Sequence, residues 1–180
     1  MNKQLIILDR DGVVNYDSDD YIKNPEEWLP IDSSILAIAE LCKAGFLVAI
    51  ASNQSGISRG YFSEQTLDRI HQKMLSIIRQ QGGDISAIEY CPDHPDHPGH
   101  DRKPSPGMAL KLLKQFNADP SKTWFVGDSL KDIQCAENAH CKPALVLTGK
   151  GQTDQYSKDL NPDVPVFKNL AYFVAQLLSK

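Results

Sequence analysis

Short apolar runs alternate along this chain with segments whose apolar residues have helical spacing. Five runs show almost no polar alternation, which is typical of strands covered on both faces of a sheet. They span residues 5–9, 46–52, 87–91, 123–128 and 144–149. Strands that alternate with helices predict a parallel sheet with right-handed crossovers. The predicted fold class is therefore α/β, with three α/β/α layers.

The helical segments are predicted from apolar residues three and four positions apart. They span residues 35–42, 67–78, 109–116 and 170–178. Asp32 and Ser63 are residue types that favour helix N-caps, and Gly45 predicts the end of the first helix. With 180 residues, 41% of them hydrophobic, the chain can bury a core of its own. We expect a single domain over residues 1–180.

Charge and cysteine content limit the class of partner. The formal net charge of −4 argues against general electrostatic attraction to nucleic acid. The N-terminal apolar run is too short for a signal peptide or a membrane helix. Four cysteines without a secretion signal predict reduced thiols. We expect a cytoplasmic monomer that binds a small molecule, and neither nucleic acid nor membrane.

Polar side chains stand where the predicted strands end. Asp9 and Asp11 follow the first run, Ser52 and Asn53 end the second, and Asp128 ends the fourth. Each has a plain structural explanation, as an Asp-Gly turn, a turn cap or a helix N-cap. Ligands of parallel sheets, however, bind beyond the carboxyl ends of the strands. Together these residues predict a site at that edge.

The order of these groups resembles the haloacid dehalogenase (HAD) superfamily of phosphatases. The resemblance rests on "LDRDGVVN", "SNQSGISRGYF", "RKPSPGM" and "GDSLKD". Within the superfamily the chain is similar to the phosphatases of heptose 1,7-bisphosphate over residues 4–152, where "DSDDYIKNPEEWLPI" and "LTGKG" also fit. The resemblance implies a Rossmann-like, HAD-like sheet. No interval is long enough for a large cap domain.

The resemblance also implies roles for the acidic residues and one lysine. Asp9 would attack phosphorus and form an aspartyl-phosphate, and Asp11 would act as general acid and base. Mg²⁺ would sit on the Asp9 carboxylate, the Asp11 backbone carbonyl and Asp128. A carboxylate is ionised at neutral pH (pKa ~3.9), so Asp9 needs no base. The phosphate repels it, however, and Mg²⁺ and Lys103 would neutralise both.

Other side chains are expected to hold the substrate. Ser52 and Asn53 would hydrogen-bond the phosphoryl group, and Arg102 would grip a second phosphate, unless it is only a surface cation. The roles of Arg59 and Lys150 stay open. The residues between Gly12 and Ile31 form only a short flap, which favours a small phosphorylated sugar.

Asp132 follows the fourth strand closely and is a further acidic residue near the predicted site. We expect it to orient Lys103 or a metal-bound water rather than to bind metal directly.

The activity that the resemblance implies is Mg²⁺-dependent hydrolysis of the C7 phosphate of D-glycero-D-manno-heptose 1,7-bisphosphate, in lipopolysaccharide core heptose biosynthesis. A histidinol-phosphate phosphatase, or another small sugar-phosphate phosphatase, is an alternative. A non-catalytic binding protein that kept the fold is a third. Loss of Asp9 or Asp11 would mark the third, and both are present.

The stretch "YCPDHPDHPGHDRKPSPG" raises the question of a structural zinc site. Related phosphatases carry Cys-x-His and then Cys-x-Cys before Arg-Lys; here Cys91 matches, but three positions depart. Those positions hold Asp93, Gly99 and Asp101. A shifted site remains an alternative, because one cysteine and three histidines suit tetrahedral zinc. Its ligands would be Cys91, His94, His97 and His100. Three prolines restrict this loop, and we expect a relic that binds little zinc.

Overall fold

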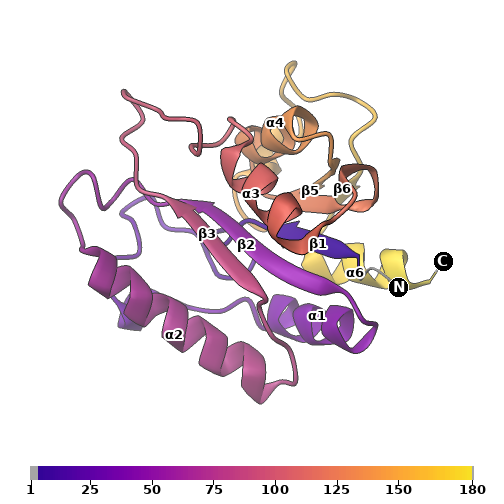
Figure 1. The fold of residues 1–180 in the computed structure, drawn as a ribbon, viewed down its shortest axis with the longest axis horizontal. Helices are drawn as coiled ribbons and strands as arrows, with labels where there is room; N and C mark the ends of the chain where they lie inside the picture. The colour runs from indigo at the N-terminus through magenta and orange to yellow at the C-terminus, as the bar shows by residue number, and fades with distance from the viewer. Residues whose placement is uncertain (1–3, 180) are drawn as a thin grey trace.

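A computed structural model describes residues 4–179 (Figure 1). Six parallel strands form one sheet in the order β3-β2-β1-β4-β5-β6. They are β1 (Leu5–Leu8), β2 (Leu47–Asn53), β3 (Ala87–Cys91), β4 (Trp124–Gly127), β5 (Lys142–Val146) and β6 (Val166–Phe167). The predicted α/β class with a parallel sheet is confirmed.

Helices cover both faces of this sheet (Figure 1). They are α1 (Asp32–Lys43), α2 (Glu64–Gln80), α3 (Gly107–Phe116), α4 (Leu130–Asn138), α5 (Gly151–Asp154) and α6 (Leu170–Leu178). Side chains of α1, α2 and α6 share one apolar cluster, and those of α3 and α4 share another. Short 3-10 turns lie at Pro25–Glu27 and Pro120–Lys122. The three predicted layers are therefore present.

Burial of strand β1 on both faces explains why its sequence lacks polar alternation. Ile6 and Leu8 belong to the cluster with α1, α2 and α6, whereas Leu5 and Ile7 belong to the cluster with α3 and α4. All four are at most 1% exposed. Burial of each such side chain stabilises the fold by about 1.5–3 kcal/mol. The strand is therefore held rigidly in the middle of the sheet, directly before Asp9.

The predicted helix ends are partly confirmed. The Ser63 hydroxyl accepts a hydrogen bond from the Thr66 amide at 3.2 Å, so Ser63 is an N-cap. Gly45 has a φ of +89° just after α1, as expected of a stop residue. The prediction for Asp32 was wrong, because Ile31 is the cap and Asp32 is the first helical residue. A carboxylate there still interacts favourably with the helix dipole.

Several elements were not predicted from periodicity. Helix α4 was missed because its apolar face is short, and β6 has only two residues. Strand β5 ends at Val146 rather than Gly149. The Thr148 hydroxyl instead donates to the Gly12 carbonyl, which turns this segment toward the end of β1. Within residues 4–179, none of the helices is both long and apolar enough to cross a membrane.

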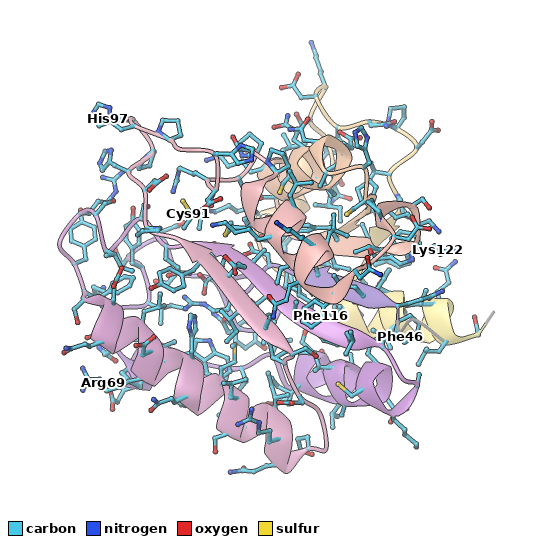
Figure 2. All side chains as sticks on the ribbon, viewed as in Figure 1. Phe46, Arg69, Cys91, His97, Phe116 and Lys122 are labelled. Atoms are coloured by element: carbon cyan, nitrogen blue, oxygen red, sulfur yellow. The ribbon has the colours of Figure 1, made fainter. Side chains whose placement is uncertain are left out.

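The histidine-rich loop after β3 does not gather the four candidate zinc ligands of the alternative interpretation. Cys91 is buried at the base of the loop, whereas His97 stands at its exposed tip (Figure 2). Within residues 4–179, no three histidine, cysteine or acidic side chains of this loop bring ligand atoms within 4.8 Å of one another. The loop is closed instead by the Gly99 amide, which donates to the Asp93 carboxylate at 2.9 Å. Low zinc content remains a prediction.

Candidate active site

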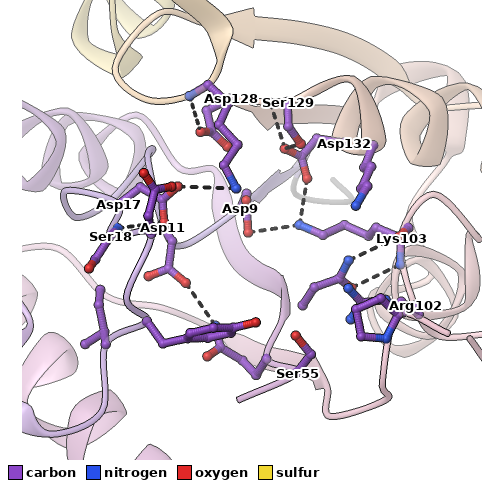
Figure 3. Close-up of a pocket in the computed structure, with 18 residues that line it drawn as sticks. Asp9, Asp11, Asp17, Ser18, Ser55, Arg102, Lys103, Asp128, Ser129 and Asp132 are labelled. Carbon is purple, nitrogen blue, oxygen red and sulfur yellow. Dashed lines mark hydrogen bonds and ion pairs between the residues drawn. The ribbon is translucent and has the colours of Figure 1, made fainter. Parts of the chain in front are cut away.

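A pocket of about 330 Å³ opens at the carboxyl ends of the central strands (Figure 3). Its wall is strongly charged, with four cationic side chains facing six carboxylates. The cations are Arg102, Lys103, Lys131 and Lys150, and the carboxylates are Asp9, Asp11, Asp17, Asp19, Asp128 and Asp132. β1 lies between β2 and β4. The residues that follow these strands therefore meet at one edge, where the sequence predicts a site.

Lys103 joins two of the carboxylates. Its Nζ lies 2.9 Å from Asp9 Oδ1 and 2.6 Å from Asp132 Oδ1, and it donates to the Ala51 carbonyl at 2.8 Å. The lysine is only 3% exposed. Burial lowers the pKa of Lys103, but the charges of Asp132 and Asp9 outweigh this and raise the pKa above its usual value. Lys103 is therefore a permanent cation beside Asp9.

Asp9, Asp128 and Asp132 form a compact acidic trio. Each offers one oxygen, and these oxygens lie within 4.8 Å of one another. Burial, together with the charge of Asp132, raises the pKa of Asp9 to about 7 and that of Asp128 to about 8. The positive charge near Asp9 and Asp128 is therefore too small to stabilise both carboxylates in their ionised forms. Clustered carboxylate oxygens are the ligands that hard divalent cations prefer, so these residues fit Mg²⁺.

Two glycines make room for the Asp128 carboxylate. A Cβ atom on Gly12 or on Gly149 would overlap Asp128 Oδ2. The backbone amide of Lys150 donates to the same oxygen at 2.8 Å. The alternative that Asp128 is a helix N-cap is wrong, because Ser129 caps α4. The glycines of "RDG" and "TGK" therefore place this carboxylate beside Asp9.

The Asp11 carboxylate lies in a nest of donors. It accepts from Arg10 Nε at 3.0 Å, from Asn15 Nδ2 at 2.9 Å and from Gln54 Nε2 at 3.0 Å. Burial raises the pKa of Asp11, but the charge of Arg10 and these hydrogen bonds outweigh burial and lower it. Asp11 is therefore an anion at rest, on the pocket wall near Asp9.

The residues predicted to bind the phosphoryl group differ in their surroundings. Asn53 lines the pocket, and its amide group pairs with the Lys103 backbone in both directions, at 3.0 and 3.1 Å. Ser52 is fully buried and is not part of the pocket wall. Gln54 and Ser55 line the pocket instead. Neither residue was predicted to bind substrate, although both directly follow the end of β2.

Further cations and the flap complete the wall. Arg102 is 7% exposed, and its Nη1 donates to the Asp93 carbonyl at 2.9 Å. Lys150 Nζ lies 3.6 Å from Asp17 Oδ2, which ties the flap to the loop after β5. Ser18 also lines the pocket, so the flap contributes to it. Arg59 does not belong to this pocket wall.

Comparisons with known proteins agree with this geometry. The model of a family described as HAD-hydrolase-like matches residues 100–173. The D-glycero-β-D-manno-heptose-1,7-bisphosphate 7-phosphatase of Pseudomonas aeruginosa is 47% identical over 178 residues, 99% of either chain. That of Neisseria meningitidis serogroup A is 46% identical and covers 98% of this chain and 96% of its own.

A solved structure extends the likeness to three dimensions. The D,D-heptose 1,7-bisphosphate phosphatase of B. bronchiseptica, complexed with magnesium and phosphate, has a TM-score of 0.95 and 44% identity. The match covers 98% of both chains. Because identity is high over almost the full length of these relatives, the chain belongs to the heptose-1,7-bisphosphate 7-phosphatase family of HAD-like hydrolases.

Proposed function

We propose that this chain is a phosphoric monoester hydrolase that removes the C7 phosphate of D-glycero-β-D-manno-heptose 1,7-bisphosphate, supplying heptose for the lipopolysaccharide core. The observation that carries the proposal is the contact of buried Lys103 with Asp9, at 2.9 Å, in a charged pocket. This contact keeps a carboxylate and a fixed cation where a phosphoryl group would react. The identity of the proposed substrate comes from the names of the relatives.

Asp9 is the nucleophile in this proposal. One of its oxygens attacks phosphorus, a new O–P bond forms, and the bond from phosphorus to the sugar oxygen breaks. The covalent aspartyl-phosphate divides one difficult step into two easier ones. Lys103 stays beside Asp9 and stabilises the negative charge that develops on the phosphoryl oxygens. Asp132 holds Lys103 in that place, since its Oδ1 lies 2.6 Å from Nζ.

The carboxylates of Asp9 and Asp128, with the backbone carbonyl of Asp11, would hold Mg²⁺. The ion, when bound, supplies positive charge that offsets the repulsion between a carboxylate and a phosphate. This assignment leaves Asp132 to Lys103 and to the cap of α4. The raised pKa values of Asp9 and Asp128 support it, because burial and the charges of neighbouring aspartates disfavour their ionised forms, and a bound cation would offset both effects.

Asp11 carries the proton in both steps. Asp11 is an anion in the free protein, so it must first take up a proton, which the negative charge of the bound substrate favours. It gives this proton to the sugar oxygen as that oxygen leaves, and then takes one from the water that attacks the aspartyl-phosphate. The second step breaks the bond between phosphorus and Asp9, releases inorganic phosphate and restores both carboxyl groups. The position of Asp11 on the pocket wall, two residues after Asp9, supports this role.

The second phosphate of the substrate would lie against Arg102, whose planar guanidinium suits a bidentate contact. Asn53, which lines the pocket, would contact the reacting phosphoryl group. Ser52 is buried behind the pocket wall, where its Oγ accepts a hydrogen bond from Gln54 Nε2 at 3.2 Å, so it would act by holding Gln54 rather than by touching the phosphoryl group. Lys150 and the flap residue Asp17 close the opposite side. One chain supplies all these groups, so a monomer suffices.

The test is hydrolysis of the purified bisphosphate with both phosphates followed by ³¹P NMR. We expect the C7 signal to convert to inorganic phosphate while the C1 signal persists. Histidinol phosphate, assayed in parallel, should give a much lower kcat/KM. Asp9→Asn protein, prepared identically, controls for contaminating phosphatase. Release of the C1 phosphate, or a higher kcat/KM with histidinol phosphate, would refute the proposed substrate.

A further inference from the structure

Arg10 is a buried arginine between the two aspartates of the first strand end. Its side chain is 1% exposed and makes an ion pair with Asp11 at 2.9 Å. Within residues 4–179, Asp11 is the carboxylate that pairs with it. The Arg10 backbone amide also donates to Asp9 Oδ1 at 2.7 Å. One residue therefore touches both carboxylates that the proposed reaction uses.

The side-chain contacts of Arg10 fix the direction of the Asp11 carboxylate. Nε and Nη2 both donate to Oδ1, at 3.0 and 2.9 Å, and Nη2 also donates to Oδ2 at 2.9 Å. Gln54 joins the same group, because its Oε1 accepts from Arg10 Nη2 at 3.3 Å while its Nε2 donates to Asp11 Oδ2 at 3.0 Å. Asn15 adds a donor to Oδ1. The carboxylate is thus held from three directions.

Packing alone does not account for an arginine at this position. Arg10 Nη1 is buried and has no hydrogen-bond partner among residues 4–179. A buried donor left without a partner costs about 1–3 kcal/mol. His71 on α2 faces this region, but burial and the charge of Arg10 lower its pKa to about 4, so it adds no charge. The interior therefore carries a costly guanidinium whose partner is Asp11.

We propose that Arg10 is a positioning residue for Asp11, and this inference rests on the proposed function. The guanidinium fork sets the orientation of the Asp11 carboxylate relative to Asp9, so that the proton reaches the leaving sugar oxygen. Gln54, which follows β2 and lines the pocket, hydrogen-bonds both Arg10 and Asp11 and so helps to fix this orientation. Arg10 itself does not line the pocket, so it acts through Asp11 rather than on the substrate.

The inference predicts a dependence on the leaving group. A sugar or alkyl alkoxide is a poor leaving group and needs the proton, whereas p-nitrophenolate leaves without one. The quantity to compare is kcat/KM, because it reports the steps up to the first irreversible one and not the later hydrolysis of aspartyl-phosphate. Misplacing the acid should therefore lower kcat/KM for the sugar phosphate far more than for p-nitrophenyl phosphate.

The experiment compares Arg10→Lys and Arg10→Met with wild type on both substrates. Lys keeps the charge but loses the fork. We expect kcat/KM for the sugar bisphosphate to fall about 10–100-fold, part of the ~10²–10⁴-fold that general acid catalysis supplies. The aryl ester should change less than about threefold. Arg79→Met is the matched control, because Arg79 makes a similar 2.9 Å pair with Asp84 at an exposed site.

Two further variants keep the test decisive if Arg10→Met does not fold. Gln54→Met removes one donor from Asp11 and should shift the ratio of the two kcat/KM values in the same direction. In an Asp11→Asn background, Arg10→Lys should add little, because the residue acts through Asp11. Equal losses on both substrates, or a full additional loss in that background, would overturn the inference. An Asp11→Asn protein whose loss is equal on both substrates would instead overturn the proposed role of Asp11.

Discussion

The Asp132 carboxylate links the cap of α4 to Lys103. Its Oδ2 accepts from the Ser129 amide at 3.0 Å and from the Ser129 hydroxyl at 2.7 Å, while its Oδ1 lies 2.6 Å from Lys103 Nζ. With Asp132 1% exposed, both contacts are shielded from water. The start of the helix and the proposed phosphate-binding cation are therefore fixed by one side chain.

Asp132→Asn should lower both stability and turnover. Asparagine carries no negative charge and has a single acceptor oxygen, so it can accept from Ser129 or from Lys103 but not from both. Removing one partner of a buried charge pair destabilises by about 3–5 kcal/mol, and Asp9 will offset part of that. Urea denaturation and kcat measure the two effects. Unchanged values for both would show that Asp132 does not hold Lys103.

Asp9→Asn should abolish turnover and leave the fold intact, because an amide has a similar shape but is a poor nucleophile. The loss of turnover should exceed that of any single substitution at Asp128 or Asp132. Circular dichroism and thermal melting check the fold, and phosphate release checks turnover. Asp84→Asn, an exposed aspartate at a remote site, is the matched control. Substantial activity in highly purified Asp9→Asn protein would contradict the covalent mechanism.

Asp11→Asn should keep substrate and Mg²⁺ binding but lose turnover by ~10²–10⁴-fold, the usual share of general acid–base catalysis. The loss should fall on kcat, whereas KM should stay close to the wild-type value. Steady-state kinetics separate the two, and isothermal titration of Mg²⁺ tests the binding. A rate close to that of wild type would assign the acid to another residue.

The stability gained from Mg²⁺ should increase with pH. In the metal-free fold Asp9 and Asp128 keep a proton up to about pH 7 and 8, whereas the unfolded chain releases it near the usual pKa of 3.8. Both groups thus make metal-free protein less stable as pH rises from about 4 to about 8. A divalent cation replaces these protons, so the Mg²⁺-induced rise in melting temperature should be larger at about pH 8 than at about pH 6.

Removal of divalent cations with EDTA should also abolish activity. A rise independent of pH, or a chelator-resistant rate, would contradict the metal role of these carboxylates.

Protein purified without added metal should contain well under one zinc per chain. Cys91 lies at the base of its loop and His97 at the tip, and the Asp93–Gly99 hydrogen bond already closes the loop. Cys91→Ser should therefore keep most of the activity and of the melting temperature. Elemental analysis and thermal melting decide the matter. Stoichiometric zinc, with a large fall in melting temperature on its removal, would make the histidines ligands after all.

The sequence by itself determined the central strands and several pocket residues. A strand that is buried on both faces has an uninterrupted apolar sequence, wherever it lies in the sheet. The strand before Asp9 could therefore be predicted from its local sequence. A polar residue directly after such a run must lie at the carboxyl end of its strand. Asp9, Asn53 and Asp128 were placed at the pocket in this way, and the structure confirms their location there.

Only the tertiary structure decided which of these side chains meet. The family resemblance implied that Lys103 acts beside Asp9 and Asp132, but the contacts themselves form because β1 lies between β2 and β4, so that residues far apart along the chain share one edge. No local periodicity encodes that neighbourhood. Local sequence also does not predict that Gln54, after β2, donates to Asp11, after the neighbouring strand β1. Nor does it predict that Asp17 of the flap pairs with Lys150. Spacing alone left a zinc site at Cys91 open as an alternative. Within residues 4–179, however, the path of the loop brings no three of its candidate ligand atoms within 4.8 Å of one another, because the direction of the backbone decides where side chains converge.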